Sequence, residues 1–191
     1  MHITSKKLVL LALVCLALSP LSAAVAWQPY LAFGSGDTKI EGKDAPYLEL
    51  ALGTPVGSRI NAEAFVAAQP LSGFPYAPFD ESVTDSVHAL AVQTGFRVSV
   101  TLFDNATFNP MMQVSAGHLA VASQETEDTA PNINTYFSSS IASGFELNFF
   151  DSFQIILLSG YRYNPHEAVV GLKKDALSSR YSSVSFRATL N

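Results

Sequence analysis

The segment 87–103 alternates between two kinds of side chain, and this alternation limits the possible folds more than any other feature. One parity is mostly large and apolar: His88, Leu90, Val92, Thr94, Phe96, Val98, Val100 and Leu102. The other parity is small or polar: Ala89, Ala91, Gln93, Gly95, Arg97, Ser99 and Thr101. A period of two predicts a β-strand rather than a helix. A small, polar second face is typical of a barrel lumen, so we expect the apolar face to meet lipid.

The composition supports a membrane barrel. Hydrophobic residues make up 48% of the 191-residue chain and charged residues only 14%. No run of eighteen apolar residues follows position 26. A membrane protein without such helices must close its sheet, because hydrocarbon cannot satisfy an open strand edge. The net charge of −5 and the absence of a basic patch argue against a nucleic-acid partner.

The N-terminus resembles an export signal. Lys6 and Lys7 precede the apolar run 8–18, and small residues lead to Ala24-Val25-Ala26. This arrangement predicts a signal peptide over 1–26, cleaved after Ala26, and a single domain over 27–191. Cys15 is the only cysteine and lies in the predicted signal, so the mature chain should contain no disulfide and no cysteine-based metal site. We expect no cofactor and no metal.

Eight strands are predicted, joined by alternately long and short connections. Their ranges are 28–35, 46–54, 58–68, 87–103, 109–122, 134–149, 153–164 and 179–190. The long connections are 36–45, 69–86, 123–133 and 165–178, and the short ones are 55–57, 104–108 and 150–152. In the strand 109–122, Leu119 and Val121 break the alternation, and one bulge would restore it. The pattern predicts an all-β, eight-stranded antiparallel up-and-down barrel with long extracellular loops and short periplasmic turns.

Several segments resemble a known family. NPMMQVSAGHLAVA (109–122), SSIASGFELNFFDSFQIILLSGYRYNP (139–165) and YSSVSFRATL (181–190) look like the fifth to eighth strands of small outer-membrane barrels of the OmpA/OmpX/OmpW type. These barrels usually end on an aromatic residue, whereas this chain ends Leu190-Asn191. The resemblance implies a monomer in the lipid of a bacterial outer membrane, acting as a narrow channel for small or partly hydrophobic solutes.

Charged residues on the inward parity form the first candidate site. They are Glu49, Arg59, Glu63, Arg97, Glu146, Arg162 and Arg187. Arginine suits confined pairing because its planar fork binds a carboxylate through two hydrogen bonds. Two interpretations remain open: a salt-bridged plug that fills a narrow barrel, or a polar pore whose selectivity these charges set. A wrong register would place some of them elsewhere. Arg180 falls on the outward parity near the loop end, where it can sit at the headgroups.

The connection 69–86 forms the second candidate site. Phe74, Tyr76 and Phe79 are its aromatic residues, and they could form an adhesive surface or the mouth of a small-molecule path. Alternatively, they pack over the barrel rim. The apolar stretch 168–172 is predicted to form a short turn of helix over the opening. If the lumen is plugged, the protein would instead be an adhesin or envelope-integrity factor that binds host or envelope partners through its loops.

Two other classes of protein are less consistent with the sequence. Ser115 and His118 lie three residues apart, so they should point to opposite faces of a strand and could not share a proton. We therefore expect no enzyme activity. A secreted calyx of lipocalin type would turn its apolar face inward, but the small polar face and the alternating connection lengths argue against it.

Overall fold

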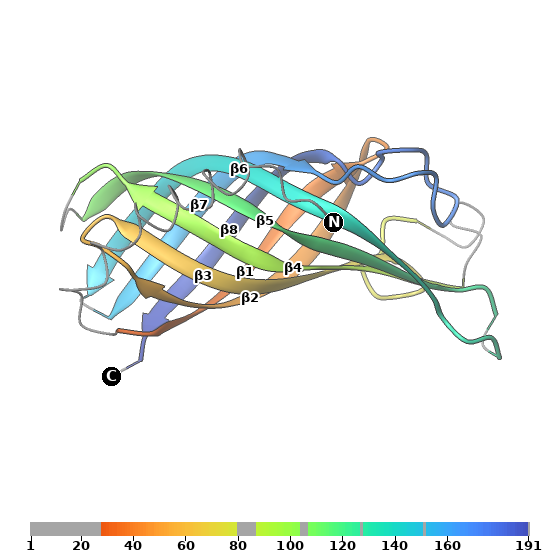
Figure 1. Ribbon diagram of the computed structural model, residues 1–191, viewed down its shortest axis with the longest axis horizontal. Helices are drawn as coiled ribbons and strands as arrows, with labels where there is room; N and C mark the ends of the chain where they lie inside the picture. Colours follow the sequence, from red (N-terminus) through yellow and green to blue (C-terminus); the bar gives the residue numbers. More distant parts are fainter. Residues whose placement is uncertain (1–27, 80–86, 104–106, 127, 151, 191) are drawn as a thin grey trace, which may run out of the picture.

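The computed structural model is a closed barrel of eight antiparallel strands, each paired with its neighbours in the chain, and β1 with β8 (Figure 1). It describes residues 28–79, 87–103, 107–126, 128–150 and 152–190, so the predicted signal peptide lies outside the described residues. The strands are β1 (Tyr30–Ile40), β2 (Lys43–Pro55), β3 (Ile60–Ser72), β4 (His88–Thr101), β5 (Phe108–Gln124), β6 (Asn132–Phe150), β7 (Phe153–Tyr163) and β8 (Ser179–Thr189). The predicted fold class is confirmed.

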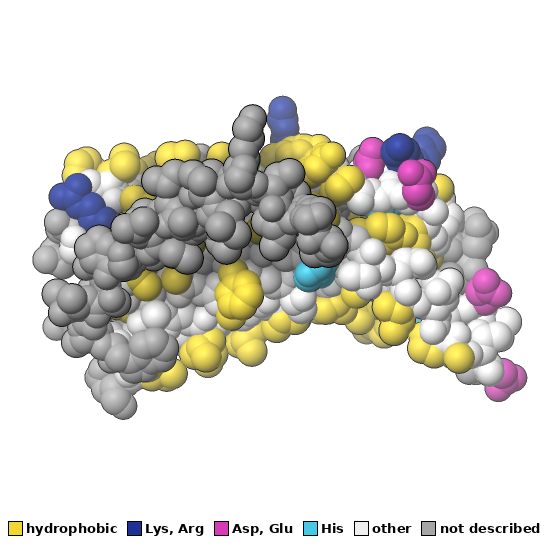
Figure 2. Space-filling view, viewed as in Figure 1, with side chains coloured by type: hydrophobic (Ala, Val, Ile, Leu, Met, Phe, Trp, Pro, Cys, Tyr) yellow, Lys and Arg dark blue, Asp and Glu magenta, His cyan; other side chains and the backbone are white. Residues whose placement is uncertain are grey.

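The wall has the two faces that the alternation predicts. On β4, Ala89, Ala91, Gln93 and Arg97 are buried in the lumen, whereas Phe96 is 74% exposed on the outside. Large apolar residues on the other strands are exposed in the same way, among them Leu31, Phe33, Leu50, Leu52, Met112, Val114, Ile141, Phe145, Val184 and Phe186. Figure 2 shows hydrophobic side chains along the visible wall and acidic side chains gathered at one end. An apolar outer belt of this kind is suited to contact with lipid tails.

The strands differ in length, and the barrel is taller on one side. β6 has 19 residues and β5 has 17, whereas about 9–11 residues suffice to cross a membrane. The β5–β6 hairpin therefore projects beyond the rest of the wall (Figure 1). Both described chain ends lie at the opposite end, where Leu190 donates a backbone hydrogen bond of 2.8 Å to Pro29. We call this the turn end and the other the loop end. No helix among the described residues is long and apolar enough to cross a membrane.

The first connection differs from the prediction. Segment 36–45 was expected to be a long loop, but β1 and β2 stay paired up to Ile40 and Lys43. Only Glu41 and Gly42 form the turn, with φ angles of 47° and 85°. Positive φ at both central residues is typical of the tight turn that suits the twist of a two-stranded hairpin. The predicted alternation of long and short connections therefore fails here. The polar residues of this segment lie in paired strands instead of a loop, because two residues are enough to close the hairpin.

The bulge expected in the fifth strand is also absent. β5 pairs without a register shift with β4 from Met111 to Gln124 and with β6 from Phe108 to Ser123. Leu119 and Val121 keep the inward parity and are 3% and 0% exposed. They interrupt the polar pattern because the lumen is apolar at the loop end. Register shifts occur instead between Pro70 and Ser72 on β3 and between Asn148 and Phe150 on β6.

Two facing glycines allow β4 and β5 to approach closely. Gly95 and Gly117 are partners in the ladder. A Cβ atom on Gly117 would lie 2.0 Å from the carbonyl oxygen of Thr94 and 2.6 Å from the Cα of Gly95. Real Cβ atoms do not approach other atoms this closely, so a larger residue at position 117 would force the two strands apart.

Candidate functional site

Glu63 stands at the centre of an ion-pair network that crosses the lumen. Its carboxylate accepts hydrogen bonds from the Nε of Arg97, from the Nη2 of Arg187 at 2.8 Å and from the Tyr30 hydroxyl at 2.8 Å. Glu63 is 3% exposed and Arg187 is also 3% exposed. A buried carboxylate must be compensated by partners of this kind, because taking it out of water is expensive. Here three donors from three different strands supply that compensation.

Each of these two arginines also binds a second carboxylate. Arg97 pairs with Glu49, and Arg187 donates to Glu146 at 3.0 Å and to the side-chain oxygen of Gln154 at 2.9 Å. The result is a chain of alternating charges, Glu49–Arg97–Glu63–Arg187–Glu146, contributed by β2, β4, β3, β8 and β6. Arginine fits this position because its fork can serve two carboxylates at once. We call these five residues the lumen network.

Aromatic rings pack against the same guanidinium groups. Arg187 lies 4.3 Å from the ring centre of Tyr30, and Arg97 lies 5.3 Å from that of Phe65. Arg162 is held by rings rather than by an ion pair within the described part of the chain, at 4.8 Å from Tyr47 and 5.3 Å from Tyr181. Contacts of this kind stabilise a cation in a site with little water. The tyrosines were missed as site residues, although their inward parity in the sequence could have revealed them.

Arg59 lies outside this network. It was expected on the inner face of a strand, but β3 begins at Ile60, and Arg59 is an exposed residue of the turn after Pro55. Its carbonyl oxygen accepts the backbone hydrogen bond of Thr101 at 2.9 Å. The remaining inward charges from the sequence, including Arg162, are all placed in the lumen.

Little open space remains around the network. A polar vestibule of about 800 Å³ opens at the turn end and reaches Glu146, Gln154 and Arg187. Above the network, a cavity of about 10 Å³ lies among Glu49 and Arg162 and their neighbours. This volume is about the minimum that holds one water molecule. A solute that enters from the turn end therefore meets Glu146 and Arg187, and beyond them finds side chains instead of a passage.

An apolar cluster closes the loop end of the lumen. Its buried members include Ile40, Leu71, Phe79, Leu119, Val121, Val169, Leu172 and Leu177. The segment 164–178 contributes the last three, and we call it the lid. The stretch 168–172 was expected to form a turn of helix, but Val169 and Leu172 pair across a tight turn with φ of 53° at Val170 and 71° at Gly171. The helix prediction is wrong because two positive φ angles reverse the chain within two residues.

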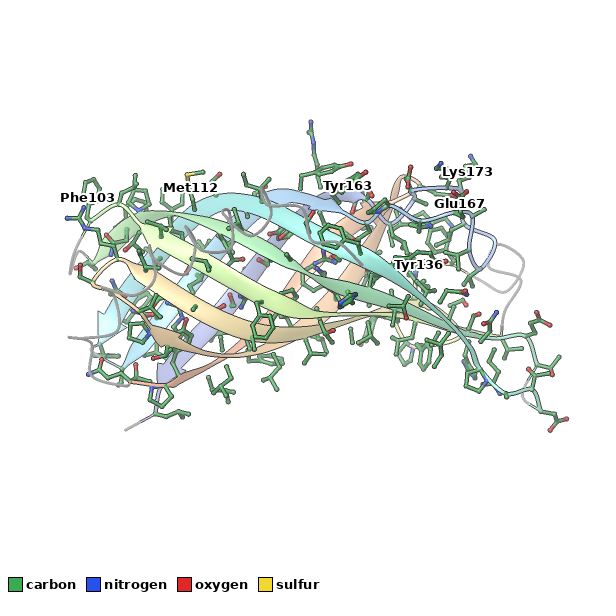
Figure 3. The ribbon with its side chains drawn as sticks, viewed as in Figure 1. Phe103, Met112, Tyr136, Tyr163, Glu167 and Lys173 are labelled. Carbon is green, nitrogen blue, oxygen red and sulfur yellow. The ribbon has the colours of Figure 1, made fainter. Side chains whose placement is uncertain are left out.

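Two buried hydrogen bonds fix the shape of the lid, and an exposed one ties it to a neighbouring hairpin. The Nε2 of His166 accepts the backbone N–H of Leu177 at 3.0 Å, and the side chain of Asn164 donates to the Leu177 carbonyl at 2.9 Å. The backbone N–H of Lys173 donates to Glu41 at 2.9 Å, which ties the lid to the β1–β2 hairpin. In Figure 3, Glu167 and Lys173 mark this end of the barrel and Phe103 marks the other. The lumen is thus closed by an apolar layer above an ionic layer.

The three aromatic residues of the β3–β4 connection take different positions. Phe79 is 5% exposed and belongs to the apolar cluster, so it packs over the rim. Phe74 is 42% exposed, and its ring lies 5.1 Å from that of His88 on the outer face of β4. Tyr76 is 88% exposed. The connection therefore closes the lumen with one ring and presents two others outside.

The Ser115–His118 pair weighed in the sequence is not assembled in the structure. Ser115 faces the lumen, where its hydroxyl lies 2.7 Å from that of Ser140, whereas His118 is exposed on the outer face of β5. The two side chains lie on opposite sides of the wall and cannot share a proton. Within the part of the chain that the structure describes, no three His, Cys, Asp or Glu side chains form a metal-binding group.

Comparison with known proteins identifies the fold. No protein-family model and no curated protein sequence matches the chain. The solved structures that resemble it include Neisserial surface protein A (TM-score 0.61, 11% identity, 86% of this chain and 97% of that one). The outer membrane protein OprG of Pseudomonas aeruginosa has a TM-score of 0.57 at 8% identity, over 87% of this chain and 97% of that one. The N-terminal β-barrel domain of P. aeruginosa OprF has 0.55 at 9%, over 86% and 100%.

At these identities the likeness concerns the fold alone. The chain has the fold of small eight-stranded outer-membrane β-barrels, which is the fold that the resemblance of its strands predicts.

Proposed function

We propose that this protein is an outer-membrane barrel with a closed lumen, which acts at the membrane surface through its loop end as an adhesin or envelope-integrity factor. The observation that carries the proposal is the lumen network, in which Glu63 binds Arg97, Arg187 and Tyr30 across the barrel. The apolar cluster beneath the lid adds a second barrier on the same path. Both layers would have to open for a solute to pass.

The free-energy cost of opening a path through the lumen favours a closed barrel. Breaking a buried ion pair by removing one partner costs about 3–5 kcal/mol in folded proteins. Opening a path through the lumen network requires that Glu63 leave two arginines, both buried among aromatic rings. Water entering the path would recover part of this cost. The apolar cluster offers no such compensation, because hydrated apolar side chains are unfavourable.

A narrow channel is the second candidate function, and the vestibule at the turn end favours it. Its volume of about 800 Å³ is large enough for a small solute, and Glu146 and Arg187 face that solute with opposite charges. A channel for small or partly hydrophobic solutes would use the polar vestibule at one end and the apolar cluster at the other. In such a channel the lid and the lumen network would act as gates.

Single-channel recording separates the two candidates. The refolded protein is placed in a planar bilayer beside Glu63→Ala and Arg97→Ala, with Glu167→Ala as a control because that side chain is exposed at the loop end. A folded wild-type barrel without openings supports the closed lumen. Stable wild-type openings whose size or ion selectivity changes in the two lumen variants, but not in the control, would refute it and establish the channel.

A loop exchange tests the surface role. Phe74 and Tyr76 in the β3–β4 connection are exchanged for serine, which removes the two exposed rings and leaves Leu71 and Phe79 in the apolar cluster. Adhesion of cells that display the protein to a host-cell layer, and resistance of the cells to detergent, are then measured. Under the proposal one of these properties falls, whereas a channel would lose neither and would retain its conductance.

A further inference from the structure

The outer wall carries a groove at the loop end that the lumen-based functions do not use. Its volume is about 620 Å³, which lies within the range of about 300–1,000 Å³ typical of small-ligand sites. The floor is formed by outward-facing residues of β8, β1, β2 and β3, and Phe74, Pro75 and Tyr76 of the β3–β4 connection lie over one side. Most of this lining is apolar.

The groove exists because the floor residues are small. Ser182 pairs with Asp37 and Asp37 with Pro46 in one row, and Ser35 pairs with Leu48 and Leu48 with Ala68 in the next row. Elsewhere the outer wall carries large side chains, such as Phe137, Ile141 and Tyr161, each at least 45% exposed. The wall is therefore indented here, because four of these six floor residues are Ser, Pro or Ala.

The overhanging turn has an unusual backbone. Ala77 donates a backbone hydrogen bond of 3.2 Å to Phe74, and Pro75 and Tyr76 are the central residues of this turn. Proline at the first central position with a positive φ at the second is the pattern of a type II turn, which ordinarily requires glycine at the second position. Tyr76 adopts a φ of 65° there. A bulky residue in this conformation is a true outlier, and it places an aromatic ring beside the groove.

The location of the groove indicates its occupant. The floor continues directly into the apolar belt through Leu48 and Val184, which are 56% and 40% exposed. A groove in the lipid-facing wall of a membrane barrel is in contact with acyl chains. At its loop-end edge, Arg180 is two residues beyond Ser182 on the same face of β8. Arg180 is exposed and has no ion-pair partner in the described ranges, so its charge can meet an anionic group beside the groove.

We propose that this groove binds an acyl chain of one outer-leaflet membrane lipid, with Phe74 and Tyr76 against the chain and Arg180 at the lipid phosphate. The site lies on the outer wall, so it does not depend on whether the lumen conducts. It gives the loop end of the proposed surface protein a lipid partner. Tyr76 suits this role because its ring is apolar and its hydroxyl is polar, a combination favoured at the membrane–water interface.

Native mass spectrometry tests the site. The protein is refolded in detergent, freed of lipid and titrated with dimyristoylphosphatidylglycerol. We expect one lipid to be retained per barrel. Ala68→Phe fills the floor and should weaken retention at least tenfold. Ala64→Phe is the matched control, because Ala64 is an exposed outward residue of the same strand that lies outside the groove. A lipid affinity of Ala68→Phe equal to that of wild type and control would overturn the proposal.

The phosphate contact has its own pair of variants. Arg180→Gln should weaken retention several-fold, whereas Lys174→Gln, which removes an exposed lysine of the lid, should not. Equal effects of the two changes would overturn the role of Arg180. The heat-dependent gel mobility of each variant reports folding, and Ser35→Leu replaces Ala68→Phe if that variant does not fold. Lipid binding that never saturates at one molecule would also overturn the proposal. None of these outcomes depends on conductance.

Discussion

Neutralising Glu63 is the most informative perturbation of the lumen. Glu63→Gln keeps the shape of the side chain but removes the charge that faces Arg97 and Arg187. The amide can still accept hydrogen bonds through one oxygen, but its NH2 group would face guanidinium donors. The two arginines would remain in a site where Arg187 is only 3% exposed. We therefore expect a large loss of stability from a change that alters the volume very little.

The magnitude follows from the remaining partners. Removing one member of a buried pair costs about 3–5 kcal/mol. Arg97 retains Glu49, and Arg187 retains Glu146 and Gln154, so we expect the lower limit, about 3 kcal/mol. Since about 1.4 kcal/mol corresponds to a tenfold change, the folding equilibrium constant should fall roughly 100-fold.

The assay is equilibrium unfolding by urea of the barrel refolded in lipid vesicles. Glu167→Gln serves as the control, because Glu167 is 84% exposed and its nearest lysine nitrogen, that of Lys174, is 3.7 Å away. An exposed pair of this kind contributes about 0–1 kcal/mol. If Glu63→Gln loses no more stability than Glu167→Gln, the lumen network does not hold the barrel together and the argument for a closed lumen fails. A double-mutant cycle of Glu63→Gln with Arg187→Gln then measures the coupling directly.

Three further predictions concern the wall, the β3–β4 connection and the lid. Tyr76→Gly removes the penalty of a positive φ, so the free energy of unfolding should rise, by at most about 1 kcal/mol because glycine also loosens the unfolded chain. The urea midpoint should rise with it, and a fall would contradict this. Gly117→Val should destabilise the barrel by at least about 1–3 kcal/mol or prevent its closure, because the new Cβ would meet the Thr94 carbonyl. The control Ala116→Val, on the outer face, should fold as wild type, and heat-modifiability gels measure both. Leu172→Asp places an unpaired charge in the apolar cluster and should expose the lid to limited proteolysis; an unchanged digestion pattern would show that the cluster does not hold the lid.

The strand pattern could be predicted because it depends on local physics. Each strand meets two different environments, and side chains alternate between them with a period of two. The same rule correctly placed Ser115 and His118 on opposite faces. It failed for segment 36–45, because the outward residues Asp37, Lys39 and Asp44 are charged, so the apolar alternation ends although the two strands stay paired. It also suggested an unneeded bulge near Leu119, because it assumed that the whole lumen is polar.

The amino-acid sequence by itself determined that this chain forms an eight-stranded barrel. It also determined the positions of most strands and of most inward-facing residues, because these features follow from periodicity along a single strand. Only the tertiary structure decided which charges meet. Glu63 and Arg187 are 124 residues apart and become partners through the closure and stagger of the barrel. For the same reason, Arg162 lies against two tyrosine rings and forms no ion pair among the described residues. Partner choice across a lumen depends on distances between distant strands, and no local pattern encodes those distances.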